Sequence, residues 1–359
     1  MPSFRTASVT EVLSERPGLA RVAVAVHDGG PAKAYAVTVL VGPVAVGDEV
    51  VLNTTAVELG LGTGGWHVVH WNLTRGAFAR SGPGHIMKLR YTSLQADTGA
   101  AEELEVDALA DARDLGGMPV VVGGLHSQVP CVAVAVAAAA PGSRVAYVMT
   151  DGGALPLALS ELVPAMAAAG LLVGTVTAGH AFGGDHEAVN VPSALTVARH
   201  VLGADVAIVA MGPGSVGTGT FLGFSALEVA PALDAAAHLG GVPVAVCRFS
   251  LADERPRHRG VSHHTRTALD LATVVASVGV PAGPFAARVR TDLVDAGLAG
   301  RHTLVEVAGV DVPDLLAAAG LHVTTMGRSP DADPGAFAVA AAAGTLAASL
   351  VRGRRRPTD

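Results

Sequence analysis

The sequence predicts an α/β protein in which a small β-barrel-like module is followed by a doubly wound, Rossmann-like parallel-sheet domain. Up to about residue 95, short apolar runs are separated by turn signals such as Asp28-Gly29-Gly30 and Gly47-Asp48. From Met118 onward, continuous apolar runs alternate with helical patterns, which is typical of a parallel sheet covered on both faces. The length of 359 residues also exceeds the usual size of one core.

The first module, residues 1–95, is expected to be all-β. Its expected strands are residues 5–13, 20–27, 34–41 and 49–52, with apolar and β-branched side chains in alternating or continuous runs. Acidic residues then gather between residues 96 and 117, which indicates a solvated linker or an exposed first helix. We therefore place the domain boundary in this acidic segment.

The second domain, residues 118–359, is expected to alternate strands and helices. The expected strands are residues 119–122, 144–149, 171–177, 205–210, 242–247 and 302–307. The expected helices are residues 129–140, 157–169, 192–202, 226–239 and 263–277, followed by an Ala-rich helix over residues 336–351. The last helix is suited to packing on the sheet or at a subunit interface, so a homo-oligomer is one expected state.

Composition excludes several classes of protein. The net charge of −7 argues against nucleic acid as the main partner. The two cysteines, Cys131 and Cys247, lie in apolar runs and are expected to be buried and reduced, which favours the cytoplasm. The N-terminus lacks the apolar stretch of a signal peptide. The Ala-rich helix is shorter than the ~20 residues that a membrane span needs, so we expect no membrane partner.

The most informative segment is DVAIVAMGPGSVGTGT, residues 205–220. An apolar strand there ends in a glycine-rich loop, where backbone amides can approach a ligand closely. A strand, such a loop and then a helix is how many α/β proteins hold phosphate, although this spacing matches neither G-x-G-x-x-G nor the Lys-containing P-loop. A tight crossover without a ligand is the plain alternative. The expected ligand-binding residues are Gly212, Gly214, Ser215, Gly217, Thr218 and Gly219, with Arg248 and Arg259 as nearby cations.

Polar side chains follow five successive strands of the predicted sheet. Because ligands of open parallel sheets bind outside the carboxyl ends of the strands, these loops are expected to form one site. The expected catalytic residues are His126, Asp151, His180, Asp185 and His263. Adjacent residues at a helix start point in different directions, so we expect at most one of His263 and His264 to face the cleft, behind an N-cap at Ser262.

Each of these residues also has a structural interpretation. His126 and His180 could be satisfied loop histidines, and Asp185 could form an Asx-turn after two glycines. The residues also allow a divalent-metal site, with His180, Asp185, His186 and His264 as ligands. No H-E-x-x-H motif or cysteine pair supports that metal site. The cofactor requirement, if any, stays open at this stage.

Several longer strings carry a family resemblance: TAVELGLGTGGWHVVHWNL, GGLHSQVP, YVMTDGGALPLALS, AGHAFGGDHEAVN, MGPGSVGTGT and RHRGVSHHTRTAL. In these strings the chain resembles a bacterial family described only as a protein of unknown function (domain of unknown function 3866). The resemblance covers nearly the whole chain and implies no activity. It does support treating the two regions as one unit.

Taken together, the residues favour a cytoplasmic enzyme that acts on a small anionic, phosphorylated or nucleotide-like substrate with His and Asp acid–base chemistry. A metal-dependent hydrolase is the first alternative. A non-enzymatic metabolite sensor or scaffold is the second, but the number of titratable groups at one sheet edge favours an enzyme.

Overall fold

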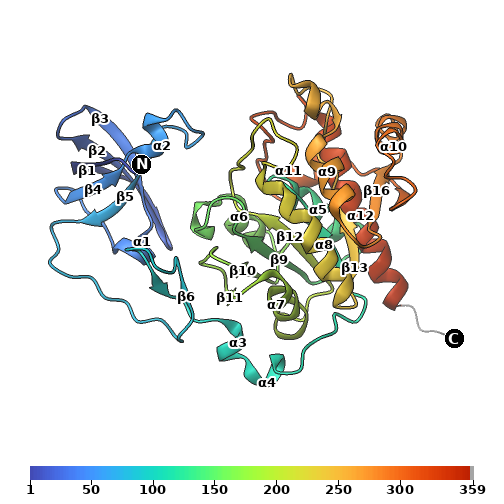
Figure 1. Ribbon diagram of the computed structural model, residues 1–359, viewed down its shortest axis with the longest axis horizontal. Coiled ribbons are helices and arrows are strands. Elements are labelled where there is room, and N and C mark those ends of the chain that lie inside the picture. The colour runs from blue at the N-terminus through green and yellow to red at the C-terminus, as the bar shows by residue number, and fades with distance from the viewer. Residues whose placement is uncertain (356–359) are drawn as a thin grey trace. The chain divides into compact units, whose positions relative to one another are not determined.

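The computed structural model describes residues 1–355, and they divide into two compact units (Figure 1). The first unit spans Met1–Thr98 and the second begins at Gly99. Each unit has its own hydrophobic core. The predicted fold class is confirmed: a five-stranded closed barrel precedes an eight-stranded parallel sheet with helices.

The first unit is a closed barrel with the strand order β1-β2-β3-β5-β4. All neighbours are antiparallel except β3 and β5, which are parallel. Alternate side chains of these strands point inward and are buried in one apolar cluster. The strands are β1 (Phe4–Arg16), β2 (Leu19–Val26), β3 (Pro31–Ala36), β4 (Glu49–Asn53) and β5 (Trp66–Asn72), with short helices α1 (Thr38–Val41) and α2 (Thr55–Glu58) between them.

Two details of the barrel differ from the sequence-based expectation. The expected strand over residues 34–41 ends at Ala36, because Thr38–Val41 forms one helical turn that closes on Gly42. The strand Trp66–Asn72 was not expected, since its sequence WHVVHWN does not alternate apolar and polar residues regularly. A small ribbon, β6 (Met87–Lys88) with β7 (Ala96–Asp97), follows the barrel.

The second unit is built on a sheet with the order β11-β10-β9-β12-β8-β13-β16-β17, and every neighbouring pair is parallel. Its central strands are buried along their whole length, which explains their continuous apolar runs. The strands are β8 (Pro119–Val122), β9 (Val145–Thr150), β10 (Gly174–Ala178), β11 (His186–Ala188), β12 (Val206–Met211), β13 (Val242–Ala245), β16 (Ser277–Pro281) and β17 (Thr303–Val307).

Helices cover both faces of this sheet. Successive residues of a strand pack into different clusters, as Val120 and Val121 do. One face is covered by α5 (Gln128–Ala139), α6 (Leu162–Ala168), α11 (Val312–Ala318) and α12 (Pro334–Arg355). The other face is covered by α7 (Val191–Thr196), η2 (Val197–Val201), α8 (Val229–His238), α9 (His263–Leu271) and α10 (Ala286–Asp295). The unit also contains α3 (Ala101–Leu104), α4 (Val106–Leu109), η1 (Leu157–Leu159), η3 (Ser225–Glu228), η4 (Pro256–His258) and the ribbon β14 (Phe249–Ser250) with β15 (Gly260–Val261).

The helix expected over residues 263–277 is too long. The structure ends α9 at Leu271, because Ala272 has an extended backbone with ψ 132°. Residues from Ser277 onward instead form β16, an interior strand of the sheet. The strand β16 and the helices α10 and α11 were not expected, and their segments carry short apolar runs that fit either helix or strand.

Helix α12 is longer than the sequence predicted, so its length does not exclude a membrane span. It contains 22 residues rather than the expected 16 or so, and it is apolar enough to cross a bilayer by composition. However, 72% of its most apolar window is buried inside the protein, and it packs on α5 and on several strands of the sheet. Burial, rather than length, therefore identifies α12 as a core helix (Figure 1).

Candidate functional site

The glycine-rich loop after β12 folds back on itself. Gly217 forms a β-bridge with Phe224, and the amide of Thr218 donates to the carbonyl of Gly223 at 2.7 Å. The amide of Val216 donates to Ser225 Oγ at 3.1 Å. The amide of Thr220 donates to Thr218 Oγ1 at 3.2 Å, so the amides of Val216, Thr218 and Thr220 are all used within the loop. Gly214 has a positive φ of 87°, which favours glycine.

This loop contacts the start of α9. The ring of Phe224 stacks on the ring of His264, with centroids 4.0 Å apart and an interplanar angle of 4°. A Cβ at Gly217 would lie 3.8 Å from His264 Cε1 and 3.9 Å from its Nε2. The structure thus brings the glycine loop and His264 together at the carboxyl edge of the sheet.

Three histidines form a cluster at this position: His258 from η4, and His263 and His264 from the first turn of α9. The ring centroids of the helix pair are 4.4 Å apart, and each of the two is 4.9 Å from His258. Both rings of the pair therefore lie in the cluster, although at most one of them was expected to face the cleft. Ser262 does cap the helix, accepting from the amide of His264 at 3.2 Å, and this tight start turns both rings toward His258.

Hydrogen bonds fix the tautomers of two of these rings. Arg248 Nη1 lies 3.3 Å from His264 Nδ1, and a guanidinium can only donate, so the proton of the neutral His264 ring is on Nε2. Arg257 Nε donates to His258 Nε2 at 3.4 Å, and His258 Nδ1 lies 2.8 Å from Ser262 Oγ. The proton of His258 is therefore on Nδ1. His264 presents an N–H on the side of its ring that faces the glycine loop.

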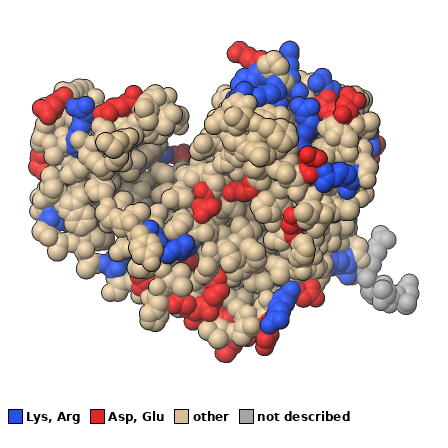
Figure 2. Space-filling view, in the orientation of Figure 1, with Lys and Arg blue, Asp and Glu red and all other residues tan. Residues whose placement is uncertain are grey.

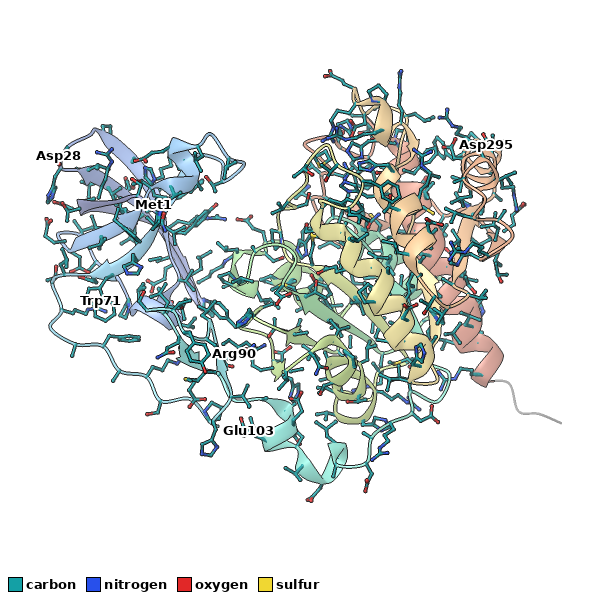
Figure 3. The ribbon with its side chains drawn as sticks, in the orientation of Figure 1. Met1, Asp28, Trp71, Arg90, Glu103 and Asp295 are labelled. Carbon is teal, nitrogen blue, oxygen red and sulfur yellow. The ribbon has the colours of Figure 1, made fainter. Side chains whose placement is uncertain are left out.

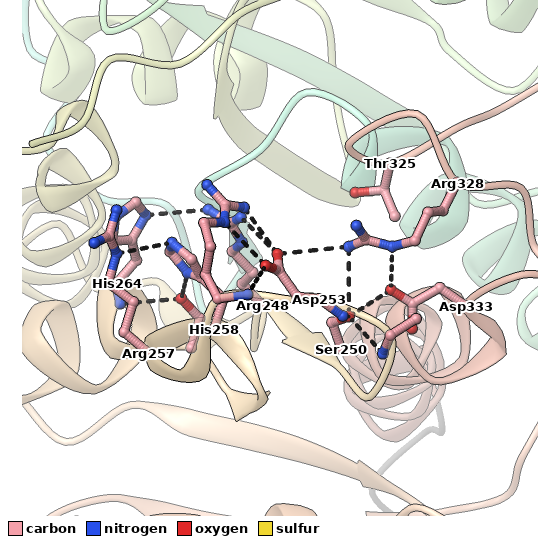
Figure 4. Close-up of polar contacts among 12 residues, drawn as sticks. Arg248, Ser250, Asp253, Arg257, His258, His264, Thr325, Arg328 and Asp333 are labelled. Carbon is pink, nitrogen blue, oxygen red and sulfur yellow. Dashed lines mark hydrogen bonds and ion pairs between the residues drawn. The ribbon is translucent and has the colours of Figure 1, made fainter.

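Arginines and two aspartates lie beside the histidine cluster (Figure 4). Asp253 accepts from Arg255 at 2.8 and 2.9 Å and lies 3.8 Å from Arg248 and 3.6 Å from Arg328. Arg328 also pairs with Asp333 at 3.0 Å. The cations Arg248, Arg255, Arg257 and Arg328 outnumber the acids Asp253 and Asp333. Figure 2 shows Lys and Arg gathered at the end of this unit where α9 begins.

Burial and this positive surrounding together keep the histidines neutral. Burial, and after it the charge of Arg248, lowers the pKa of His258 and of His264 to about 3. Burial and the nearby arginines also lower the pKa of His263. The pKa of Arg248 falls to about 10, first because it is buried and then because Arg255 is close. At pH 7 the imidazoles are proton acceptors or neutral donors, while the arginines supply the charge.

Two buried polar atoms in the cluster have no hydrogen-bond partner. These are Arg248 Nη2 and His263 Nε2. Arg248 and His264 also line a small cavity of about 20 Å³ together with Gly124 and Ala226, which is room for about one water molecule. A ligand larger than this cavity would extend over the exposed glycine loop. Arg248 Nη2 can only donate, and a buried donor without a hydrogen bond is costly, so this site is suited to an acceptor.

The remaining predicted residues have other contacts. His126 is buried between Ser160 Oγ at 2.7 Å and Tyr147 Oη at 3.1 Å, and burial lowers its pKa to about 4. Asp151 accepts from the amide of His180 at 2.9 Å. Asp185 accepts from both the amide and the hydroxyl of Thr175 at 2.8 and 2.9 Å, which ties the start of β10 to the segment just before β11. Arg259 is exposed, with its Nε 3.5 Å from the carbonyl of Leu251, and His186 begins β11.

The sequence places His258 and Arg257 in the polar loop after the fifth strand of the predicted sheet but assigns them no role, since the string RHRG carries no known spacing. Sequence reasoning missed Arg328, which is distant in the sequence. Glu228 was also missed. Its Oε1 lies 2.5 Å from Thr150 Oγ1, and burial raises its pKa to about 7, an effect to which Asp151 adds. The one available signal was that all four residues follow the carboxyl ends of strands or border such loops.

A family model described as "Protein of unknown function (DUF3866)" matches residues 33–344, which include the barrel strands β4 and β5, the glycine loop and the histidine cluster. The chain belongs to this family. No curated protein and no solved structure matches the chain. The DUF3866 match extends over part of the first unit and most of the second.

Proposed function

We propose that this DUF3866 protein is an enzyme that binds a small anionic substrate between the glycine loop and the histidine cluster. The single observation that carries the proposal is the buried Arg248 Nη2, which makes no hydrogen bond and has only a 3.8 Å ion pair with Asp253, beside three neutral imidazoles in a surplus of positive charge. A phosphate or carboxylate oxygen would supply the missing acceptor. We further propose that the protein acts in the cytoplasm, in agreement with its two free, buried cysteines.

Acid–base chemistry follows from the tautomers. The Nε2–H of His264 can donate to an oxygen of the substrate, and an anion there would offset the arginine charge that lowers the histidine pKa values. His263 Nε2, buried and unpartnered, is suited to accept the proton that is moved. In this proposal His126 and Asp185 hold the framework, while the histidine cluster carries the proton transfer.

The test measures heat stability in sodium phosphate against sodium chloride of equal ionic strength. Phosphate should raise the melting temperature of the wild type, because a ligand that binds only the folded state stabilises it. Arg248→Gln should lose this response, while Arg301→Gln, which removes an exposed pair with Asp270, should keep it. Arg257→Gln, an exposed member of the cluster, provides a second variant that should weaken the response without a folding defect.

Turnover is tested with a panel of phosphate monoesters. We expect His264→Gln to lower kcat by about 100-fold or more, with a smaller change in KM, because a proton-transfer group acts mainly in the transition state. If phosphate stabilises the wild type and no panel member is turned over in any condition, a metabolite sensor replaces the enzyme. If phosphate has no effect, the anion site itself is wrong.

A divalent metal is the second candidate, since one ligand atom from each of His258, His263 and His264 lies within 4.8 Å of the others. A metal on His264 Nε2 would require a proton on Nδ1, which faces the donor Arg248. The surplus of arginine charge also repels a cation. The metal site predicts that Zn²⁺ raises the melting temperature and that His263→Ala removes this effect; the anion site predicts no such response.

A further inference from the structure

The outer face of the barrel carries a group of aromatic and cationic side chains that the parallel-sheet site does not use. Tyr35 on β3 and Trp66 on β5 are stacked, with ring centroids 4.7 Å apart and an interplanar angle of 20°. The guanidinium of Arg21 lies 5.7 Å from the Tyr35 ring and 5.9 Å from the Trp66 ring. The ammonium of Lys33 lies 5.5 Å from Trp66. We call Arg21, Lys33, Tyr35 and Trp66 the aromatic face.

Strand register explains why these side chains meet. Arg21 is directly opposite Tyr35 across β2 and β3, and Lys33 is directly opposite Trp66 across β3 and β5. Their neighbours Ala34 and Ala36 point inward and are buried, so the four side chains point outward. Along the same face of β2 the next outward residues are Ala23 and Ala25, whose small side chains leave the surface beside the rings open.

A glycine-rich loop borders the aromatic face. The string GLGTGG, residues 60–65, leads directly into Trp66. A Cβ at Gly60, Gly62 or Gly65 would meet nothing within 4 Å, so this loop is open to a ligand that lies on the rings. Val68, the next outward residue of β5, is 40% exposed.

We propose that the aromatic face binds single-stranded nucleic acid, with bases on the Tyr35–Trp66 rings and phosphates near Arg21 and Lys33. Aromatic stacking accepts any base, and cations beside the rings suit a phosphodiester backbone better than a neutral sugar. Five-stranded barrels of the OB type use the face of their second and third strands for oligonucleotides, an analogy that agrees with the position of these side chains.

Charge does not exclude this ligand. The net charge of −7 belongs to the whole chain, whereas residues 1–98 contain eight Lys and Arg against seven Asp and Glu. Glu11 is the acid opposite Ala23 at the rim of the face. Its removal should therefore tighten binding. This site is independent of the anion site proposed for the parallel sheet.

The test uses the full chain and a fluorescein-labelled 16-nucleotide dT strand, with binding followed by fluorescence anisotropy. Binding should weaken with added NaCl, because phosphate contacts release counterions. Tyr35→Ala and Trp66→Ala should each weaken binding about 10-fold or more, and Trp66→Phe, which keeps a ring, should lose less. Lys33→Ala should also reduce the dependence on salt, and Glu11→Gln should strengthen binding.

Phe4→Ala is the matched control. Phe4 is an aromatic residue of the same barrel that is 46% exposed, and it contacts His70 rather than the aromatic face. Trp71→Phe is a second control, since Trp71 (labelled in Figure 3) lies further along β5 and its loss simplifies Trp66 fluorescence. Melting temperatures of all variants report folding. No binding by the wild type, equal binding of a 16-base-pair duplex, or competition by a neutral oligosaccharide without salt dependence would each overturn the proposal.

Discussion

At the scale of single residues, Gly217 decides how closely a ligand can approach His264. A Cβ there would lie 3.6–3.9 Å from Phe224 and His264, which is ordinary contact, and its φ is not positive. The backbone therefore tolerates a side chain. We expect Gly217→Val to fold with an unfolding free energy within about 1 kcal/mol of the wild type, and to lose stabilisation by phosphate because its methyl groups fill the space at His264 Nε2.

Gly219 provides the control for this experiment, since a Cβ at Gly219 would meet nothing within 4 Å. Gly219→Val should keep the phosphate response, measured as the shift in melting temperature. If phosphate raised the melting temperature of both variants equally, the loop would be only a crossover between β12 and α8.

Glu228 gives stability a dependence on pH. Burial raises its pKa from 4.5 to about 7, so the folded state binds the proton more tightly than the unfolded state does. The unfolding free energy that this group contributes is therefore present at low pH and is lost as pH rises from about 4.5 to about 7. A change of this size corresponds to about 3 kcal/mol at most.

The prediction concerns Glu228→Gln, which keeps an acceptor for Thr150 and cannot ionise. Relative to the wild type, this variant should gain about 1–3 kcal/mol between pH 5 and pH 8, as measured by urea unfolding at both values. Glu306→Gln, at an exposed glutamate paired with Arg290, should show no such gain. Parallel curves for wild type and Glu228→Gln would mean that Glu228 is ionised throughout.

At the scale of elements, the contact of α12 with α5 depends on Gly344. A Cβ at this position would overlap the carbonyl oxygen of Val132 and would lie 3.0 Å from Ala135 Cβ. The two helices can therefore approach this closely only at a glycine. Gly344→Ala should lower the unfolding free energy by about 1–3 kcal/mol, because overpacking outweighs the better helix propensity of alanine.

Gly353, in the same helix, serves as the comparison, because a Cβ there would meet nothing within 4 Å. Gly353→Ala should leave stability unchanged or raise it by up to about 1 kcal/mol. Chemical denaturation of both variants checks the pair. A stabilised Gly344→Ala protein would show that α12 can move away from α5 without cost.

The elements also show what the sequence could predict. Strands such as Pro119–Val122 and Val206–Met211 are continuous apolar runs in the centre of a parallel sheet, and their positions follow from that pattern. Strand β16 contains a proline and a glycine, and Gly279 is needed because Ala342 of α12 lies against it. The requirement for this glycine comes from tertiary packing, which the local sequence pattern does not show.

The candidate site could likewise be predicted only in part. Strand ends identified the glycine loop and the pair at 263 and 264, because parallel strands place their carboxyl ends at one edge. His258 was predicted to lie in the loop after the fifth strand, but its contact with Ser262 depends on how η4 folds. Arg328 was not predictable, since its contact with Asp253 depends on how the segment before α12 folds over that edge.

At the scale of the whole molecule, each unit is closed around its own apolar side chains, and the DUF3866 match nevertheless spans both. Our two proposals assign a separate ligand to each unit.

The position of α12 in the chain has a consequence for biosynthesis. This helix follows every strand of the parallel sheet in sequence, yet it covers strands β8, β13, β16 and β17 and the helix α5. During translation those apolar surfaces are synthesised first. They stay exposed to solvent until α12, which begins more than 200 residues after β8, has left the ribosome. We therefore expect the nascent chain to be prone to aggregation until α12 has been synthesised.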